Sequence, residues 1–149
     1  MARQFPIVAD AASAFRFALE AELAGADFAA AAEVVAPGEP WREKFEVLTC
    51  AHDDRLQKLR AHQSGVDAAA AADWSDIDGT GPAHVLEGEP AATWPAAAVQ
   101  MAEVEDAIAA YHEAFAARAA DALADDARLF AKAAQQARSA AAELRAMLG

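Results

Sequence analysis

The chain has 149 residues, enough for one domain that buries its own core without disulfides or a structural metal. Its formal net charge of −12 argues against a nucleic-acid partner, because phosphate binding needs clustered lysine and arginine. The start lacks the apolar core of a signal peptide, no stretch is apolar enough to span a bilayer, and the single cysteine, Cys50, cannot form an internal disulfide. We therefore expect a cytoplasmic protein that does not enter membranes. Abundant alanine and few β-branched residues predict an all-α fold.

The first predicted helix spans residues 10–35. Asp10 suits the N-cap position, and Pro37 with Gly38 ends the helix. Phe5, Ile7 and Val8 in the preceding segment are expected to fold back over it. Apolar residues lie on two faces, with Glu22 as the polar exception on one and with Phe17 and Phe28 on the other. A helix with two apolar faces needs two neighbours, which are either other helices of the bundle or a second subunit.

The second predicted helix runs from Pro40 to about Gln63, before Ser64 and Gly65. His52 lies at the centre of its apolar stripe, which consists of Trp41, Phe45, Leu48, His52, Leu56 and Leu59. An imidazole in a core stripe needs a polar partner on a neighbouring helix.

Residues 65–95 are too long for a turn between antiparallel helices, so we predict a crossover from one end of a bundle to the other. A short helix is expected within residues 67–74. Trp74 and Trp94 are expected to anchor the crossover against the bundle.

The third predicted helix spans residues 95–120, and the fourth begins near Asp125 as N-cap and runs to Leu148. No glycine or proline separates the two, so one bent helix is the alternative. Glu105 and His112 lie one heptad apart beside the third helix's apolar stripe. That stripe consists of Met101, Val104, Ile108, Tyr111, Phe115 and Ala119.

Four long helices with a long middle connection predict an antiparallel four-helix bundle. Residues 19–33 align weakly with residues 102–116, matching Glu22 with Glu105 and Phe28 with Tyr111. With the Phe45-x-x-Leu48 opening of the second helix, this pattern resembles the ferritin-like superfamily, and most closely its rubrerythrin-like members. The resemblance implies a di-iron site with one glutamate from each of the first and third helices and a Glu-x-x-His pair from each of the others.

Several of the family's ligand positions hold other residues in this chain. Glu22 and Glu105 match the two single glutamates, but the Glu-x-x-His positions fall on His52 and Arg55 in the second helix. In the fourth helix they fall on Ala137 and Ala140, which cannot bind metal. The resemblance therefore implies a degenerate di-iron site.

The inward-facing residues Glu22, His52, Glu105 and His112 are enough for a single iron, manganese or zinc ion. Two alternatives use the same residues without a metal. One is a buried polar cluster in which Arg55 neutralises the carboxylates. The other is acid–base catalysis by His52 with Glu105, for which no nucleophile or oxyanion hole is evident.

Residues 76–87 resemble the calcium loop of an EF-hand, with Asp76, Asp78, Thr80 and Glu87 at ligand positions and Gly81 at the turn. Thr80 is a poor fifth ligand, and Gly88 with Pro90 prevents the usual exit helix. We expect an acidic loop here rather than a calcium site.

The sequence thus predicts one ferritin-like domain over residues 1–149 that has lost the standard di-iron site and acts as a non-catalytic binding or scaffold module. The alternative is a metal-dependent oxidoreductase or iron-handling protein. The sequence leaves open whether the chain is an enzyme. A homodimer is expected from the two apolar faces of the first helix.

Overall fold

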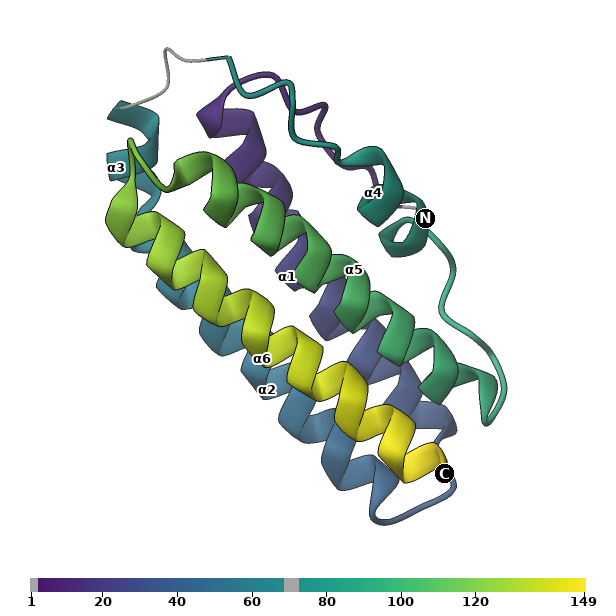
Figure 1. The fold of residues 1–149 in the computed structure, drawn as a ribbon. Coiled ribbons are helices and arrows are strands. Elements are labelled where there is room, and N and C mark those ends of the chain that lie inside the picture. Colours follow the sequence, from purple (N-terminus) through teal and green to yellow (C-terminus); the bar gives the residue numbers. More distant parts are fainter. Residues whose placement is uncertain (1–2, 69–72) are drawn as a thin grey trace.

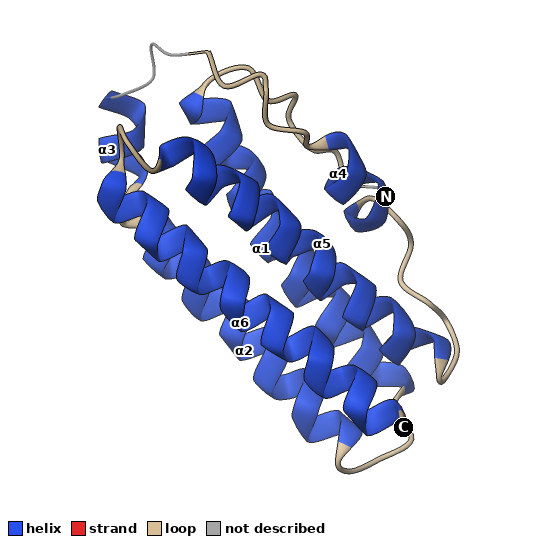
Figure 2. Cartoon of the chain, in the orientation of Figure 1, coloured by secondary structure: helices blue, strands red, loops and turns tan. Residues whose placement is uncertain are grey.

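The computed structural model describes residues 3–68 and 73–149 and is all-helical over those ranges. Four long helices, α1 (Ala11–Val35), α2 (Trp41–Arg60), α5 (Ala96–Ala119) and α6 (Ala124–Leu148), lie side by side (Figure 1). Two short helices, α3 (Gln63–Ala68) and α4 (Thr80–Leu86), belong to the long connection between α2 and α5 (Figure 2). No helix in the described ranges combines the length and hydropathy needed to cross a bilayer.

The start of α1 confirms the predicted N-cap. Asp10 Oδ1 accepts a hydrogen bond from the Ser13 amide at 2.8 Å, and Ser13 Oγ accepts one from the Asp10 amide at 3.0 Å. This reciprocal capping satisfies amide groups that have no partner within the helix. At the other end α1 stops at Val35, and Gly38 takes a positive φ of 131° in the turn to α2.

The end of α2 and the start of α6 differ from the predictions. α2 ends at Arg60 rather than near Gln63, and the residues expected to stop it, Ser64 and Gly65, lie within α3. His62 Nδ1 lies 2.8 Å from Asp126 Oδ1 of α6, a tertiary contact that fixes the chain where α2 ends. Asp125 is not the N-cap of α6, because Leu123 occupies that position and Asp125 lies in the first turn. The alternative of one bent helix is also wrong, since α5 and α6 are separate.

The crossover contains a helix, α4, that was not predicted. The helix expected within residues 67–74 is wrong at its end, because Trp74 is not helical; residues 69–72 of that range lie outside the described residues. The predicted anchors are confirmed. The Trp74 ring is buried with its centroid 5.1 Å from that of Phe115, and the Trp94 ring lies 4.8 Å from that of Trp41.

The second apolar face of α1 is covered by the chain itself. The Phe5 ring centroid lies 4.7 Å from that of Phe17, and a β-carbon at Gly79 would lie 2.8 Å from the same ring. Phe17 is therefore buried, and Phe28 is buried as well. The homodimer stays a prediction. The fold-back of Phe5 is confirmed, but Ile7 is 91% exposed and takes no part in it.

The long helices pack unequally. α1 pairs with α2 and α5 pairs with α6, while α1 also packs on α5 (Figure 1). α2 and α6 touch only sparsely. α6 faces the core mostly with alanines, and such small side chains leave space between neighbouring helices unless a larger side chain fills it.

Candidate functional site

A layer of polar side chains divides the core in two. One cluster of buried apolar residues includes Phe28, Phe45, Leu48, Ile108 and Leu144, and the other includes Phe15, Leu59, Tyr111, Phe115 and Phe130. Along α2, His52 and Arg55 of this layer lie between Leu48 of one cluster and Leu59 of the other. The layer consists of Glu22, His52, Arg55, Glu105 and His112, each at most 7% exposed.

His52 bridges the two glutamates. Its Nδ1 donates to Glu22 Oε2 at 2.8 Å, and its Nε2 donates to Glu105 Oε1. An ionised carboxylate only accepts hydrogen bonds, so His52 makes both of these bonds at once as an imidazolium. Burial alone would lower the pKa of His52, but the charge and hydrogen bond of Glu105, together with those of Glu22, raise it to about 9.

Glu22 is the centre of the layer and accepts from three side chains. Besides His52, Arg55 Nε donates to Glu22 Oε1 at 3.0 Å and His112 Nε2 donates to the same oxygen at 2.9 Å. Burial works to raise the pKa of Glu22, but the hydrogen bonds from His112 and His52 and the charges of His52 and Arg55 hold it well below its ordinary value. The carboxylate is therefore ionised inside the core.

The two cations of the layer lie close together. Arg55 Nη2 is 3.0 Å from His52 Nδ1 and 3.9 Å from Glu105 Oε2. When His52 is charged, Arg55 Nη2 and His52 Nδ1 both carry hydrogen, so these two groups repel each other. The negative charges of Glu22 and Glu105 offset this repulsion. Two carboxylates and two cations leave the layer close to neutral.

Two buried atoms of the layer have no hydrogen-bond partner among the described residues, Glu105 Oε2 and His112 Nδ1. Because His112 donates through Nε2, its Nδ1 holds a lone pair when the ring is neutral. Both atoms are buried without a partner, and such an atom requires a physical reason.

Gly25 is a part of the site that sequence reasoning missed. A β-carbon at Gly25 would lie 2.6 Å from Nδ1 and 2.7 Å from Nε2 of His52, closer than real contacts allow. The imidazole therefore lies against the backbone of α1 at the one position without a side chain. A glycine inside a helix of otherwise strong helix formers was the available sign of such a close approach.

The four predicted residues Glu22, His52, Glu105 and His112 do lie together, yet they do not fit a di-iron centre. Such a centre needs carboxylates and histidines from all four helices, whereas α6 supplies alanine at the matching positions and the Arg55 guanidinium already bonds to Glu22. Within residues 3–68 and 73–149, no three His, Cys, Asp or Glu side chains form a group that could hold a metal ion. Binding of a single metal by rearrangement stays a prediction.

Residues 76–87 do not form a twelve-residue calcium loop. Thr80 begins α4, a helix of 7 residues, so more than half of the segment is helical. Asp78 Oδ1 accepts from the Thr80 amide at 2.9 Å, and Asp76 Oδ1 accepts from Arg118 Nε at 3.3 Å. Asp78 thus stabilises the turn before α4 and Asp76 forms an ion pair, but the segment is not the acidic loop that we expected, because α4 occupies residues 80–86 of it.

His52 is poorly placed for acid–base catalysis. Its side chain is fully buried, and both of its nitrogens are bonded to carboxylates. A general acid or base must reach its substrate within hydrogen-bond distance, which this arrangement does not offer.

Comparisons with protein-family models, with curated proteins and with solved structures found no match to this chain.

Proposed function

We propose that this chain is a ferritin-like bundle in which an internal ion network replaces the di-iron centre, and that it acts as a non-catalytic binding module. The observation that carries the proposal is the Arg55 guanidinium, whose Nε lies 3.0 Å from Glu22 Oε1. It brings positive charge to the carboxylates that the family resemblance assigns to metal.

The charge balance supports this proposal. Two ionised glutamates need about two positive charges to be stable inside a core, and His52 with Arg55 provides them. A divalent ion bound between the same glutamates would face both cations. His52 would also have to lose its proton to act as a ligand, which its raised pKa opposes.

Metal content tests the proposal directly. We would purify the protein without chelators or a metal-binding tag and measure iron, manganese, zinc and calcium per chain, before and after anaerobic incubation with ferrous iron. We expect no stoichiometric transition metal. Nitrogen NMR of His52 at neutral pH should show both ring nitrogens protonated. About one metal equivalent per chain, lost in Glu105→Ala, would overturn the proposal.

The second candidate function is binding of one iron, manganese or zinc ion, which would make the chain a metal-dependent oxidoreductase or an iron-handling protein. It is favoured by the two buried atoms that have no hydrogen-bond partner among the described residues, Glu105 Oε2 and His112 Nδ1. Under this alternative, His112→Gln would lower metal affinity while His84→Gln, a change on α4 away from the polar layer, would leave it unchanged. The metal content per chain separates the two candidates.

A further inference from the structure

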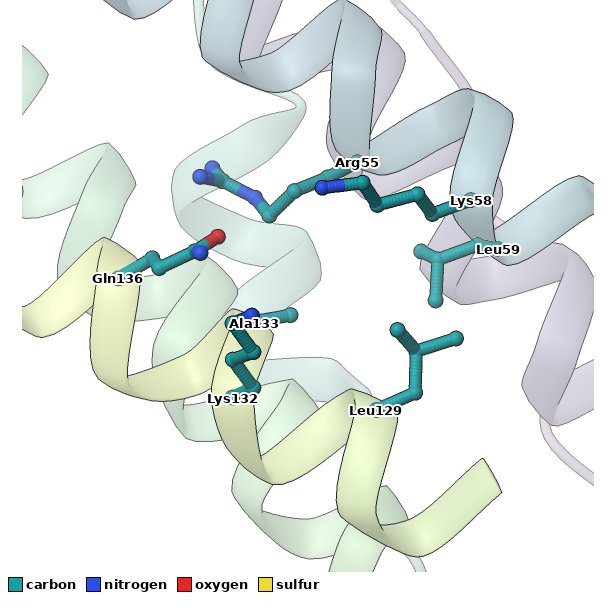
Figure 3. Close-up of a pocket in the computed structure, with 7 residues that line it drawn as sticks. All are labelled: Arg55, Lys58, Leu59, Leu129, Lys132, Ala133 and Gln136. Carbon is teal, nitrogen blue, oxygen red and sulfur yellow. The ribbon is translucent and has the colours of Figure 1, made fainter. Parts of the chain in front are cut away.

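A cavity of about 150 Å³ lies between α2 and α6, beside the ion network. Figure 3 shows Arg55, Lys58 and Leu59 of α2 on one side of it and Leu129, Lys132, Ala133 and Gln136 of α6 on the other. Ala133 is the buried residue of α6 that lines the cavity, and its small side chain leaves this space open. A larger residue at position 133 would fill this space.

The lining is cationic in a strongly acidic protein. Arg55, Lys58 and Lys132 line the cavity, and no carboxylate of the described residues does, although the chain as a whole carries a net charge of −12. A neighbouring hollow along the same groove shares Arg55, Lys58 and Gln136, and it also includes Lys44 and the carboxylates of Asp54 and Glu143. All three lysines of the chain, Lys44, Lys58 and Lys132, therefore lie along the groove between α2 and α6.

The three lysines are not equivalent. Lys44 pairs with Glu143, whereas no ion pair of Lys58 or Lys132 is found within the described part of the chain. Lys58 and Lys132 approach the cavity from opposite helices, so an anion between them would meet two cations that form no ion pair within the described residues. The Arg55 charge is already balanced by Glu22.

The remaining lining is apolar and consists of Leu59, Leu129 and Ala133. A cavity of this size holds a body about as large as a benzene ring. We propose that the groove between α2 and α6 is a binding site for a small organic carboxylate whose apolar body packs on these three residues and whose carboxylate lies between Lys58 and Lys132, with Gln136 as a further donor. This inference rests on the proposed function, since it names the class of ligand that the binding module takes.

The test uses benzoate as the probe, with benzyl alcohol as the uncharged analogue and inorganic phosphate as the anion without an apolar body. Titration calorimetry on the full chain should give a dissociation constant for benzoate on the order of 1 mM, in keeping with its few heavy atoms. The Lys58→Gln/Lys132→Gln double variant should weaken benzoate binding about tenfold or more. Ala133→Leu should weaken it similarly by filling the cavity.

Lys44→Gln is the matched control, because Lys44 lies on the same groove but is already paired with Glu143. It should bind benzoate as the unmodified chain does. Lys58 and Lys132 are exposed, so the double variant tests the site even if Ala133→Leu fails to fold. The inference is overturned by absent benzoate binding, by unchanged affinity in the double variant, or by equal binding of benzyl alcohol or phosphate. None of these outcomes alters the metal content, so failure here is distinct from failure of the proposed ion network.

Discussion

The imidazole of His52 lies against the backbone of α1 at Gly25, where a β-carbon would come within 2.6 Å of Nδ1. Gly25→Ala should therefore destabilise the protein by about 2 kcal/mol, even though alanine favours helix over glycine by about 1 kcal/mol. Urea unfolding followed by circular dichroism measures the change.

Gly65→Ala is the control for this prediction. Gly65 is also helical, in α3, but a β-carbon added there would meet nothing within 4 Å. Alanine there should be neutral or slightly stabilising, because only helix propensity changes. If both substitutions stabilised the protein equally, the close packing of His52 on α1 would be wrong.

The two buried glutamates should differ in their contribution to stability. Within the described residues, Glu22 accepts from His52, Arg55 and His112, whereas Glu105 accepts only from His52. Glu22→Gln should cost about 3 kcal/mol of unfolding free energy, because it leaves two cations poorly balanced, and Glu105→Gln should cost at least about 1 kcal/mol less. Denaturant unfolding at neutral pH compares these variants, which make the same chemical change at equally buried sites. A larger loss for Glu105→Gln would contradict the central place of Glu22.

Stability should fall as the pH rises from neutral. The pKa of His52 is raised to about 9, so its proton stabilises the folded state fully below about pH 6.5 and that contribution is lost as the pH rises through about 9. The loss is on the order of 3 kcal/mol. The pKa of Glu22 is lowered in the folded state, so its negative charge stabilises the fold fully above about pH 4.5. This stabilisation is lost as the pH falls through the folded pKa, which lies well below that value.

Urea unfolding across this pH range tests the assignment to His52. His52→Gln should show a much weaker loss of stability between pH 6.5 and about 9. His84→Gln, which changes a histidine on α4 outside the polar layer, should keep the pH dependence of the unmodified chain. An unchanged pH dependence in His52→Gln would assign the effect to another group.

Tyr111, the single tyrosine of the chain, provides a spectroscopic probe of the core. Burial raises the pKa of its hydroxyl above the ordinary value, and the hydroxyl donates to the Ala14 carbonyl oxygen at 2.7 Å. In an alkaline titration, phenolate absorbance should therefore appear together with unfolding. Gradual ionisation centred near about pH 10 while the helices remain folded would contradict this burial. Tyr111→Phe should remove the absorbance change and cost about 1 kcal/mol of stability.

The sequence alone determined the all-α class, the bounds of α1 and α5, and the inward position of Glu22, His52 and Glu105; it placed His112 only at the edge of an apolar stripe, and the structure buries it. These features follow from local capping and from the spacing of apolar residues, which are properties of the chain at short range. The predicted end of α2 and start of α6 were wrong because tertiary contacts decide them. His62 contacts Asp126 across the bundle, and no pattern in the local sequence predicts that contact.

Only the tertiary structure decided what the buried polar residues do. Spacing along one helix shows that His52 faces the core, but it cannot show that His52 donates to glutamates on two other helices or that Gly25 makes room for its ring. Nor can it show that Lys58 and Lys132, 74 residues apart in the chain, line one cavity. Hydrogen bonds and close packing depend on distances between helices, and these are fixed only when the four long helices pack together.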